Sequence, residues 1–185
     1  MEPAEWASLE TFSFGDNPAL AEELAGLAAV AEKQGQHRRA VALAEEGLRL
    51  AREMGHSSST AIALSRLGQM VFRGGDYQRA LALFQESLVL RRTLGSREGV
   101  ARSLVGLASV ALAQARPEHA ARLFGAAEAM RDLVNAPLPP ADRVDYERQL
   151  AALQKELDET TFAAAWAEGR ALRLEQAVAH AERDS

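Results

Sequence analysis

The chain has 185 residues, which suits one domain, with 48% hydrophobic residues, 25% charged residues and a net charge of −5. This composition excludes a chain that is disordered throughout, and its Ala- and Leu-rich apolar share favours helices over sheets. The absence of cysteine excludes disulfides and thiol chemistry, and the acidic balance argues against direct nucleic-acid binding. The sequence shows neither an apolar run long enough for a membrane span nor a secretory signal pattern, so we expect a cytoplasmic protein.

The first segment, residues 1–17, is apolar for the end of a chain. Trp6, Leu9, Phe12 and Phe14 would all be exposed in a free tail. We therefore expect this N-terminal segment to form a capping helix over the first helical unit, as a remnant of or a substitute for a packed helix.

Residues 18–134 contain an internal repeat. When residues 21–60 are aligned with residues 61–100, the identical positions are mostly small or apolar, and a further shift of forty residues retains several of them. The repeated element is therefore a packing unit and not a duplicated active site. The three expected units are 18–56, 57–96 and 97–134.

Each unit is predicted to consist of two helices. In the second unit, Leu64, Leu67 and Val71 share one buried stripe of the first helix. The glycine pair at 74 and 75 then ends that helix, and the second helix begins at about Tyr77. A small residue recurs where the two helices must come close. The residues expected to pack the units together are Leu24, Leu27, Ala40, Leu64, Leu67, Gly68, Tyr77, Ala80, Phe84, Leu104, Leu107, Ala120 and Phe124.

The third unit departs from this pattern, and a proline-rich segment follows it. Ala115 stands where the other units have a turn glycine. Pro117 stands at the start of the second helix, where proline is tolerated. Residues 136–140 contain three prolines, so no helix can cross them, and we expect a short, stiff linker.

Three more helices are predicted after this linker, at about residues 141–157, 159–168 and 174–182. Asp158 can cap the second of them. Residues 135–185 are thus expected to form a proline-rich linker and a C-terminal helical cap over the exposed end of the array. The residues of the first of these helices that are expected to face inward are Val144, Leu150, Leu153 and Leu157.

The second unit resembles the tetratricopeptide repeat. The resemblance rests on Leu64, Leu67-Gly68, Gly75-Asp76-Tyr77, Ala80 and Phe84. It implies an all-α, right-handed superhelix of three helix pairs, with a protein or peptide ligand on the concave face and no cofactor. The unit exceeds the family's usual 34 residues, which implies longer second helices or longer links.

A more specific resemblance covers residues 60–183. Residues 123–128, 136–140 and 162–169 are similar to the C-terminal helical arm of bacterial signal-transduction ATPases with AfsR/LuxR-like or maltose-activator-like architecture. In these regulators the array follows a nucleotide-binding domain and senses an inducer or a partner protein. This chain has no phosphate-loop motif and no basic recognition helix. The resemblance therefore implies a sensing or scaffold arm in transcription regulation that binds neither ATP nor DNA itself.

The candidate binding residues lie on the first helices of the second and third units. Arginines at these positions can form bidentate bonds to carboxylates of a peptide. Phe72 either faces the groove as an aromatic anchor or packs between units as core. The family's carboxylate clamp needs Lys and Asn where this chain has Ala25 and Ala29, so we do not expect the C-terminal-peptide clamp. The concave-groove candidates are Arg66, Gln69, Phe72, Arg73, Arg102 and Ser109.

The sequence contains no catalytic or metal-binding motif. The four histidines, at positions 37, 56, 119 and 180, are dispersed without a ligand spacing, although the fold can still bring them together. We therefore expect a non-enzymatic protein or peptide interaction module without a bound metal. Two alternatives stay open: a homodimerisation module that uses the alanine-rich segment 162–168, and a small-molecule inducer sensor.

Overall fold

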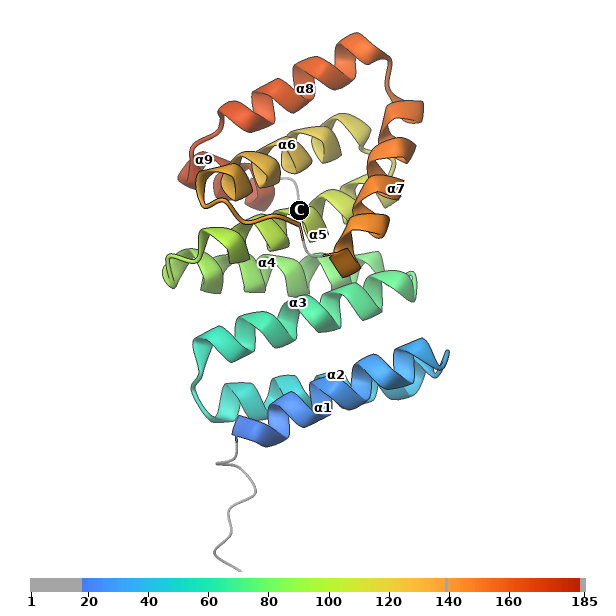
Figure 1. The fold of residues 1–185 in the computed structure, drawn as a ribbon, viewed down its shortest axis with the longest axis vertical. Coiled ribbons are helices and arrows are strands. Elements are labelled where there is room, and N and C mark those ends of the chain that lie inside the picture. Colours follow the sequence, from blue (N-terminus) through green and yellow to red (C-terminus); the bar gives the residue numbers. More distant parts are fainter. Residues whose placement is uncertain (1–17, 139, 184–185) are drawn as a thin grey trace, which may run out of the picture.

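The computed structural model describes residues 18–138 and 140–183, which form helices joined by short connections (Figure 1). The all-α class predicted from the sequence is confirmed for these residues. The expectation for residues 1–17 lies outside the described part of the chain. The helices are α1 (Pro18–Lys33), α2 (His37–Glu53), α3 (Ser57–Arg73), α4 (Tyr77–Thr93), α5 (Arg97–Ala113), α6 (Pro117–Leu133), α7 (Pro140–Glu156), α8 (Glu159–Ala171) and α9 (Leu174–Arg183).

The first six helices repeat with a constant geometry. Each helix from α2 to α6 has 17 residues, and the turns between them are three residues long. Each period is therefore two helices and two short turns, so the extra length of the unit lies in the helices and not in the links. The pairs α1–α2, α3–α4 and α5–α6 pack most closely, and they stack into a superhelix (Figure 1).

The middle residue of each turn in the array has a positive φ. Glycine fills the first four of these positions, with φ between 67° and 86°. Ala115 adopts the same conformation with φ 57°, and Asn135 adopts it after α6 with φ 48°. Alanine has a Cβ that makes this left-handed region unfavourable, so the turn before α6 is strained relative to its equivalents.

Replacing Ala115 by glycine is expected to raise the free energy of unfolding by about 1 kcal/mol, since the left-handed conformation penalises alanine and not glycine. The reverse change, Gly75→Ala, is the matched control and should lower the free energy of unfolding by about as much. A Cβ at Gly75 would meet no atom within 4 Å, so this control tests backbone conformation alone. Urea unfolding followed by circular dichroism measures both effects, and two unchanged midpoints would contradict the strained turn.

The hydrophobic core lies within and between the helix pairs. Ala40, Ala80 and Ala120 are all 0% exposed, where the two helices of each pair come close. A Cβ at Gly68 would come within 2.9 Å of the Phe84 ring, so this glycine makes room for the phenylalanine. The other buried residues among those expected to pack are Leu64, Leu67, Leu104, Leu107 and Phe124.

Leu27 and Tyr77 differ from this expectation. Leu27 is 53% exposed, whereas its equivalent Leu67 is 1% exposed. The reason is that α3 packs on the second helix of the preceding unit, while α1 packs chiefly on α2 and no described helix precedes it. Leu24 on the same helix is half-buried. Tyr77 is 37% exposed because it opens α4 at the surface, where its ring lies 5.4 Å from that of Phe72.

The three C-terminal helices occupy three different places (Figure 1). α8 packs along α6, at the end of the array. α7 lies beside α3 and α5, with which it lines one cavity, and α9 contacts α4 and α6. The helix that follows the proline-rich linker therefore lies over the groove and not over the end of the superhelix.

The orientation of α7 differs from the expectation for Val144, whereas the start of α8 agrees with the expectation for Asp158. Val144 was expected to face inward, but it is 70% exposed, because the buried stripe passes instead through Tyr146, 8% exposed, and Leu153, 0% exposed. Leu150 and Leu157 lie half-buried on the same stripe. Asp158 caps α8 as predicted: its Oδ1 accepts a hydrogen bond from the backbone N–H of Thr161 at 3.0 Å.

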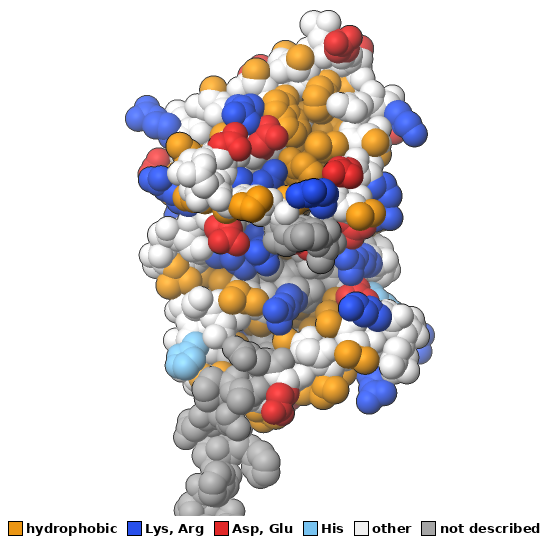
Figure 2. Space-filling model, in the orientation of Figure 1, with side chains coloured by type: hydrophobic (Ala, Val, Ile, Leu, Met, Phe, Trp, Pro, Cys, Tyr) orange, Lys and Arg blue, Asp and Glu red, His pale blue; other side chains and the backbone are white. Residues whose placement is uncertain are grey.

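The surface that faces the viewer in Figure 2 is mixed in character. Hydrophobic side chains gather near the C-terminal end of the array, and charged side chains of both signs surround them. On α8, Phe162 and Trp166 are half-buried hydrophobic residues whose rings lie 5.4 Å apart. None of the helices in the described part of the chain combines the length and apolar character of a membrane-crossing segment.

Candidate functional site

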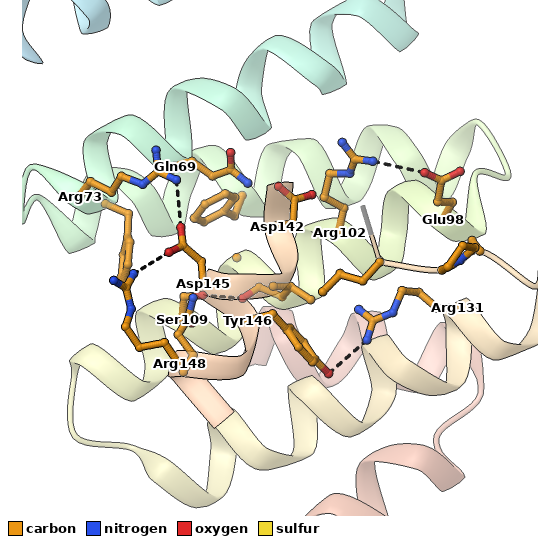
Figure 3. A pocket seen from close by; sticks show the side chains of 18 residues that line it. Gln69, Arg73, Glu98, Arg102, Ser109, Arg131, Asp142, Asp145, Tyr146 and Arg148 are labelled. Carbon is orange, nitrogen blue, oxygen red and sulfur yellow. Dashed lines mark hydrogen bonds and ion pairs between the residues drawn. The ribbon is translucent and has the colours of Figure 1, made fainter. Parts of the chain in front are cut away.

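A cavity of about 120 Å³ lies between α7 and the concave face of the array (Figure 3). α3 and α5 supply one side of it, and α7 together with linker residues 136–138 supplies the other. Phe84 of α4 and Arg131 of α6 also reach the cavity. α7 therefore covers this side of α3 and α5 without filling all the space between them.

The structure brings most of the predicted groove residues to this cavity. Arg66 is the exception: it lies on α3, exposed, three residues before the first residue of that helix to line the cavity. The distance of one helical turn is enough to take its side chain out of the site. The predicted residues that line the cavity are Gln69, Phe72, Arg73, Arg102 and Ser109.

Phe72 and Ser109 shape the wall of the cavity and offer it no free hydrogen-bonding group. Phe72 is half-buried against the hydrophobic core and also lines the cavity, so it combines the two roles considered for it. Ser109 is 7% exposed, and its Oγ donates a hydrogen bond to the carbonyl oxygen of Val105 on its own helix at 2.8 Å. The hydroxyl of Ser109 is thus already engaged.

Arg73 connects α7 to the array. Its Nη1 donates to Glu32 of α1 at 2.9 Å, and its Nη2 donates to Oδ2 of Asp145 on α7 at 3.1 Å. Arg148 of α7 donates to the other oxygen of Asp145 at 2.7 Å (Figure 3). Partial burial by itself would lower the pKa of Arg73, but the hydrogen bonds and charges of Glu32 and Asp145 outweigh it and raise the pKa. The predicted groove arginine is therefore occupied by carboxylates of the chain itself.

Tyr146 is the main anchor of α7 next to the cavity. Its ring meets that of Phe124 edge-on, with centroids 5.4 Å apart. Arg131 donates to the Tyr146 hydroxyl at 3.1 Å, and its Cζ lies 4.8 Å from the centre of the tyrosine ring. Burial raises the pKa of Tyr146 against the opposing effect of Arg131, so the phenol stays protonated at neutral pH. A cation–π contact and an aromatic pair thus hold one turn of α7.

Several polar groups of the cavity have no full partner. Oε1 of Gln149 is buried and accepts no hydrogen bond from the residues that the structure describes. Asp142 lines the cavity without an ion pair among the described residues, and Arg131 has no carboxylate partner among them. Among the described residues, Arg102 pairs with Glu98 of its own helix at 3.2 Å. The cavity therefore offers donors and acceptors around an apolar floor that includes Phe84 and Val105.

The sequence contained a signal for α7 that the apolar residues alone did not reveal. Asp142, Tyr146, Gln149 and Leu153 follow the three- and four-residue spacing of one helix face, and Asp145 lies beside them. The N-terminal half of this face is polar, so the hydrophobic pattern of the sequence does not identify the face as buried. It becomes recognisable as an inward face only when the basic groove opposite it is known.

A buried polar cluster lies between α3, α4 and α5. Arg91 is 7% exposed, and its Nε donates to Oγ of Ser87 at 3.0 Å. Ser87 Oγ in turn donates to the carbonyl oxygen of Ala61 at 2.9 Å and lies 2.8 Å from Ser65 Oγ and 3.2 Å from Ser103 Oγ. No carboxylate among the described residues is hydrogen-bonded to Arg91, whose N–H groups donate to Ser87, Ser65 and the carbonyl oxygen of Ala61. None of these residues lines the cavity.

The fold also brings two of the dispersed histidines together. Nδ1 of His119 on α6 lies 3.1 Å from Nε2 of His180 on α9, and the two rings are 4.8 Å apart. Within residues 18–138 and 140–183, no group of three or more His, Asp or Glu side chains has the geometry to hold a metal ion. The histidine pair brings α9 against α6.

Comparison with known proteins locates the repeat. Residues 59–132, which span nearly all of α3 to α6, match the family model of the tetratricopeptide repeat. No curated protein matches the chain.

Proposed function

Because the chain carries a tetratricopeptide-repeat domain, we propose that its concave groove binds a segment of another protein. Such domains generally mediate protein–protein interaction, and the fold itself does not select the ligand. The proposal covers a non-enzymatic module with a protein or peptide partner and without a cofactor or direct nucleic-acid contact.

One observation carries this proposal: the concave face keeps a cavity with unfilled bonding capacity. The polar side chains of Arg102 and Gln69 line the cavity (Figure 3), and Phe84 and Val105 form an apolar part of its wall. A peptide segment that places an aliphatic or aromatic side chain in the cavity and a carboxylate near Arg102 would use both features. A volume of about 120 Å³ suits one side chain and not a whole helix.

The wider context follows from the resemblance of residues 123–128, 136–140 and 162–169 to bacterial regulators. We propose that the chain serves as the sensing or scaffold arm of such a regulator in the cytoplasm. The homodimer alternative rests on α8, whose Ala163, Ala164 and Ala167 are exposed and permit close helix contact. The inducer-sensor alternative rests on the same cavity as the peptide proposal.

The groove proposal predicts a specific pattern of lost binding. Against fluorescein-labelled acidic peptides, Arg102→Ala should weaken binding about tenfold, which corresponds to about 1.4 kcal/mol, because a charge-assisted bond is lost. Arg66→Ala should have a much smaller effect, since Arg66 lies outside the cavity. Fluorescence anisotropy titrations measure both.

Arg49→Ala is the matched control for this experiment. Arg49 is an exposed arginine on α2 that pairs with Glu46 and Glu53, so the variant makes the same change of charge away from the groove. Peptides that bind wild type, Arg102→Ala and Arg49→Ala equally would rule out the groove around Arg102 as the binding site.

A further inference from the structure

We propose that α7 is a built-in occupant of the groove, and that the partner is an amphipathic helix that replaces it with the same chemistry. Such a helix carries a carboxylate followed directly by a tyrosine, with leucines four and seven residues after the tyrosine. The template is Asp145, Tyr146, Leu150 and Leu153 of this chain. This inference rests on the proposed function of the groove and names the class of partner.

The inward face of α7 has two halves of different character. Its N-terminal half is polar, with Asp142, Asp145 and Gln149 lining the cavity. Its C-terminal half is apolar, and Leu153 is 0% exposed in the core. The acidic half lies opposite the arginines of α3 and α6, so charge and polarity match between α7 and the surface beneath it. A ligand helix would need the same division.

α7 is fastened to the array at few points. On the polar half, the described contacts to the array are the Arg73–Asp145 ion pair and the contacts of Tyr146 with Arg131 and Phe124. The side chains of Arg73 and Asp145 are 50% and 38% exposed, so solvent screens their attraction. Tyr146 is therefore the anchor whose removal should free this half of the helix.

The fit between α7 and the groove is incomplete, which leaves room for a better ligand. A cavity of about 120 Å³ remains beneath the helix, which is large enough to hold several water molecules. Oε1 of Gln149 is buried there without a partner, which is an unfavourable state for a polar atom. A helix with an apolar side chain at the position of Gln149 would remove the unpaired oxygen and fill space over Phe84 and Val105.

The attachment of α7 at both ends makes this an intramolecular competition. Residues 134–139 join it to α6, and α8, which follows it, packs along α6. Leaving the groove therefore requires no separation of α8 from the array. Since the tether keeps α7 close, the apparent affinity for an external helix is reduced by the fraction of molecules in which the groove is open.

The test uses a labelled synthetic peptide of residues 140–157 as the external helix and the full chain as receptor. Tyr146→Ala in the chain should raise the affinity for this peptide at least tenfold over wild type, because the internal helix competes less well. The matched control is Val144→Ala, which changes an exposed residue of the same helix and should leave affinity as in wild type. The Tyr146→Ala peptide should lose binding to the opened chain. A Gln149→Leu peptide should bind it more tightly than the unchanged peptide.

A cross-link provides a second, independent readout. The chain has no cysteine, so Arg73→Cys/Asp145→Cys introduces one pair only, which a short bismaleimide can join across the position of the former ion pair. Peptide binding should be present in this double variant before cross-linking and abolished after it, with identical residues in both samples. Circular dichroism verifies that every variant keeps the helical content of wild type.

The outcomes separate this inference from the function it rests on. Equal binding of the peptide of residues 140–157 before and after cross-linking, or by wild type and Tyr146→Ala, would overturn the role of α7. If acidic peptides still bound in an Arg102-dependent way under those conditions, the groove function would stand alone. If hydrogen exchange showed α7 released in Tyr146→Ala and neither kind of peptide bound, both proposals would fall.

Discussion

Replacing Gly169 by alanine is expected to lower the free energy of unfolding by about 3 kcal/mol. A Cβ at Gly169 would collide with the backbone carbonyl oxygen of Arg122, and a Cβ at Gly125 with that of Trp166. These two glycines therefore let the backbones of α6 and α8 touch. Because the obstacle is backbone and not a flexible side chain, the helices must move apart to accept even one methyl group. Urea unfolding monitored by circular dichroism measures the effect.

The control for this variant is Gly26→Ala on α1. A Cβ there would meet no atom within 4 Å, and Gly26 is exposed within a helix. Its replacement should raise the free energy of unfolding by about 0.5 to 1 kcal/mol through helix propensity. If Gly169→Ala behaved like Gly26→Ala, the α6–α8 seam would not have the close approach described. The flanking Arg122–Glu168 and Arg170–Glu128 ion pairs are exposed and cannot offset the collision.

The Ser87→Ala variant is expected to lose about 2 kcal/mol of stability, because it removes the hydroxyl that binds a buried guanidinium. Arg91 would keep its charge while losing the 3.0 Å hydrogen bond to Ser87. The Arg91→Met variant should stay within about 1 kcal/mol of wild type or exceed it, since removal of a buried charge also removes its desolvation cost. In the double variant Ser87→Ala should then cost much less than it does alone. Additive effects in this cycle would contradict the coupling of the two residues.

The pKa of Arg91 adds a pH dependence to the same comparison. Burial lowers this pKa to about 10, with a smaller lowering by the charge of Arg102 and an opposing effect of Glu98. The folded state therefore binds the proton less tightly than the unfolded chain does, so the protein gains stability from this group as the pH rises through about 10. Any advantage of Arg91→Met over wild type should be largest at neutral pH and shrink above about pH 10. Parallel urea titrations across this range measure the difference.

The fold was largely predictable because residues at the turns of the repeat determine where each helix begins and ends. A turn glycine and a three-residue link recur at fixed intervals, and Pro117 and Asp158 mark helix starts by their own chemistry. Leu27 shows the limit of this reasoning. Its place in the repeat is equivalent to that of a buried leucine, but burial also requires a neighbouring helix, and periodicity within the chain does not supply one at the end of the array.

The candidate site was predictable on one side only. The register of α3 and α5 identified Arg73 and Arg102 as groove residues, because helices of a repeat present the same face at the same position. The opposite side depends on where the linker directs α7, which is set by tertiary packing and not by local propensity. Without that information Val144 looked like a better inward residue than Tyr146. Asp145 and Gln149 follow the spacing of the inward face, but the polar character of that half hid its orientation, and Arg131 on α6 was not among the expected groove residues.

The close approach of α6 and α8 at Gly125 and Gly169 also sets where the array can grow by duplication. Copies of a forty-residue segment inserted before α6 would meet neighbours of the same kind, since the turns and helix lengths there are interchangeable. A copy inserted after α6 would separate Gly125 and Gly169 from the backbone groups of Trp166 and Arg122 for which they make room. Evolution and protein engineering can therefore lengthen this superhelix from its interior or its α1 end, while the α8 end acts as a fixed terminus.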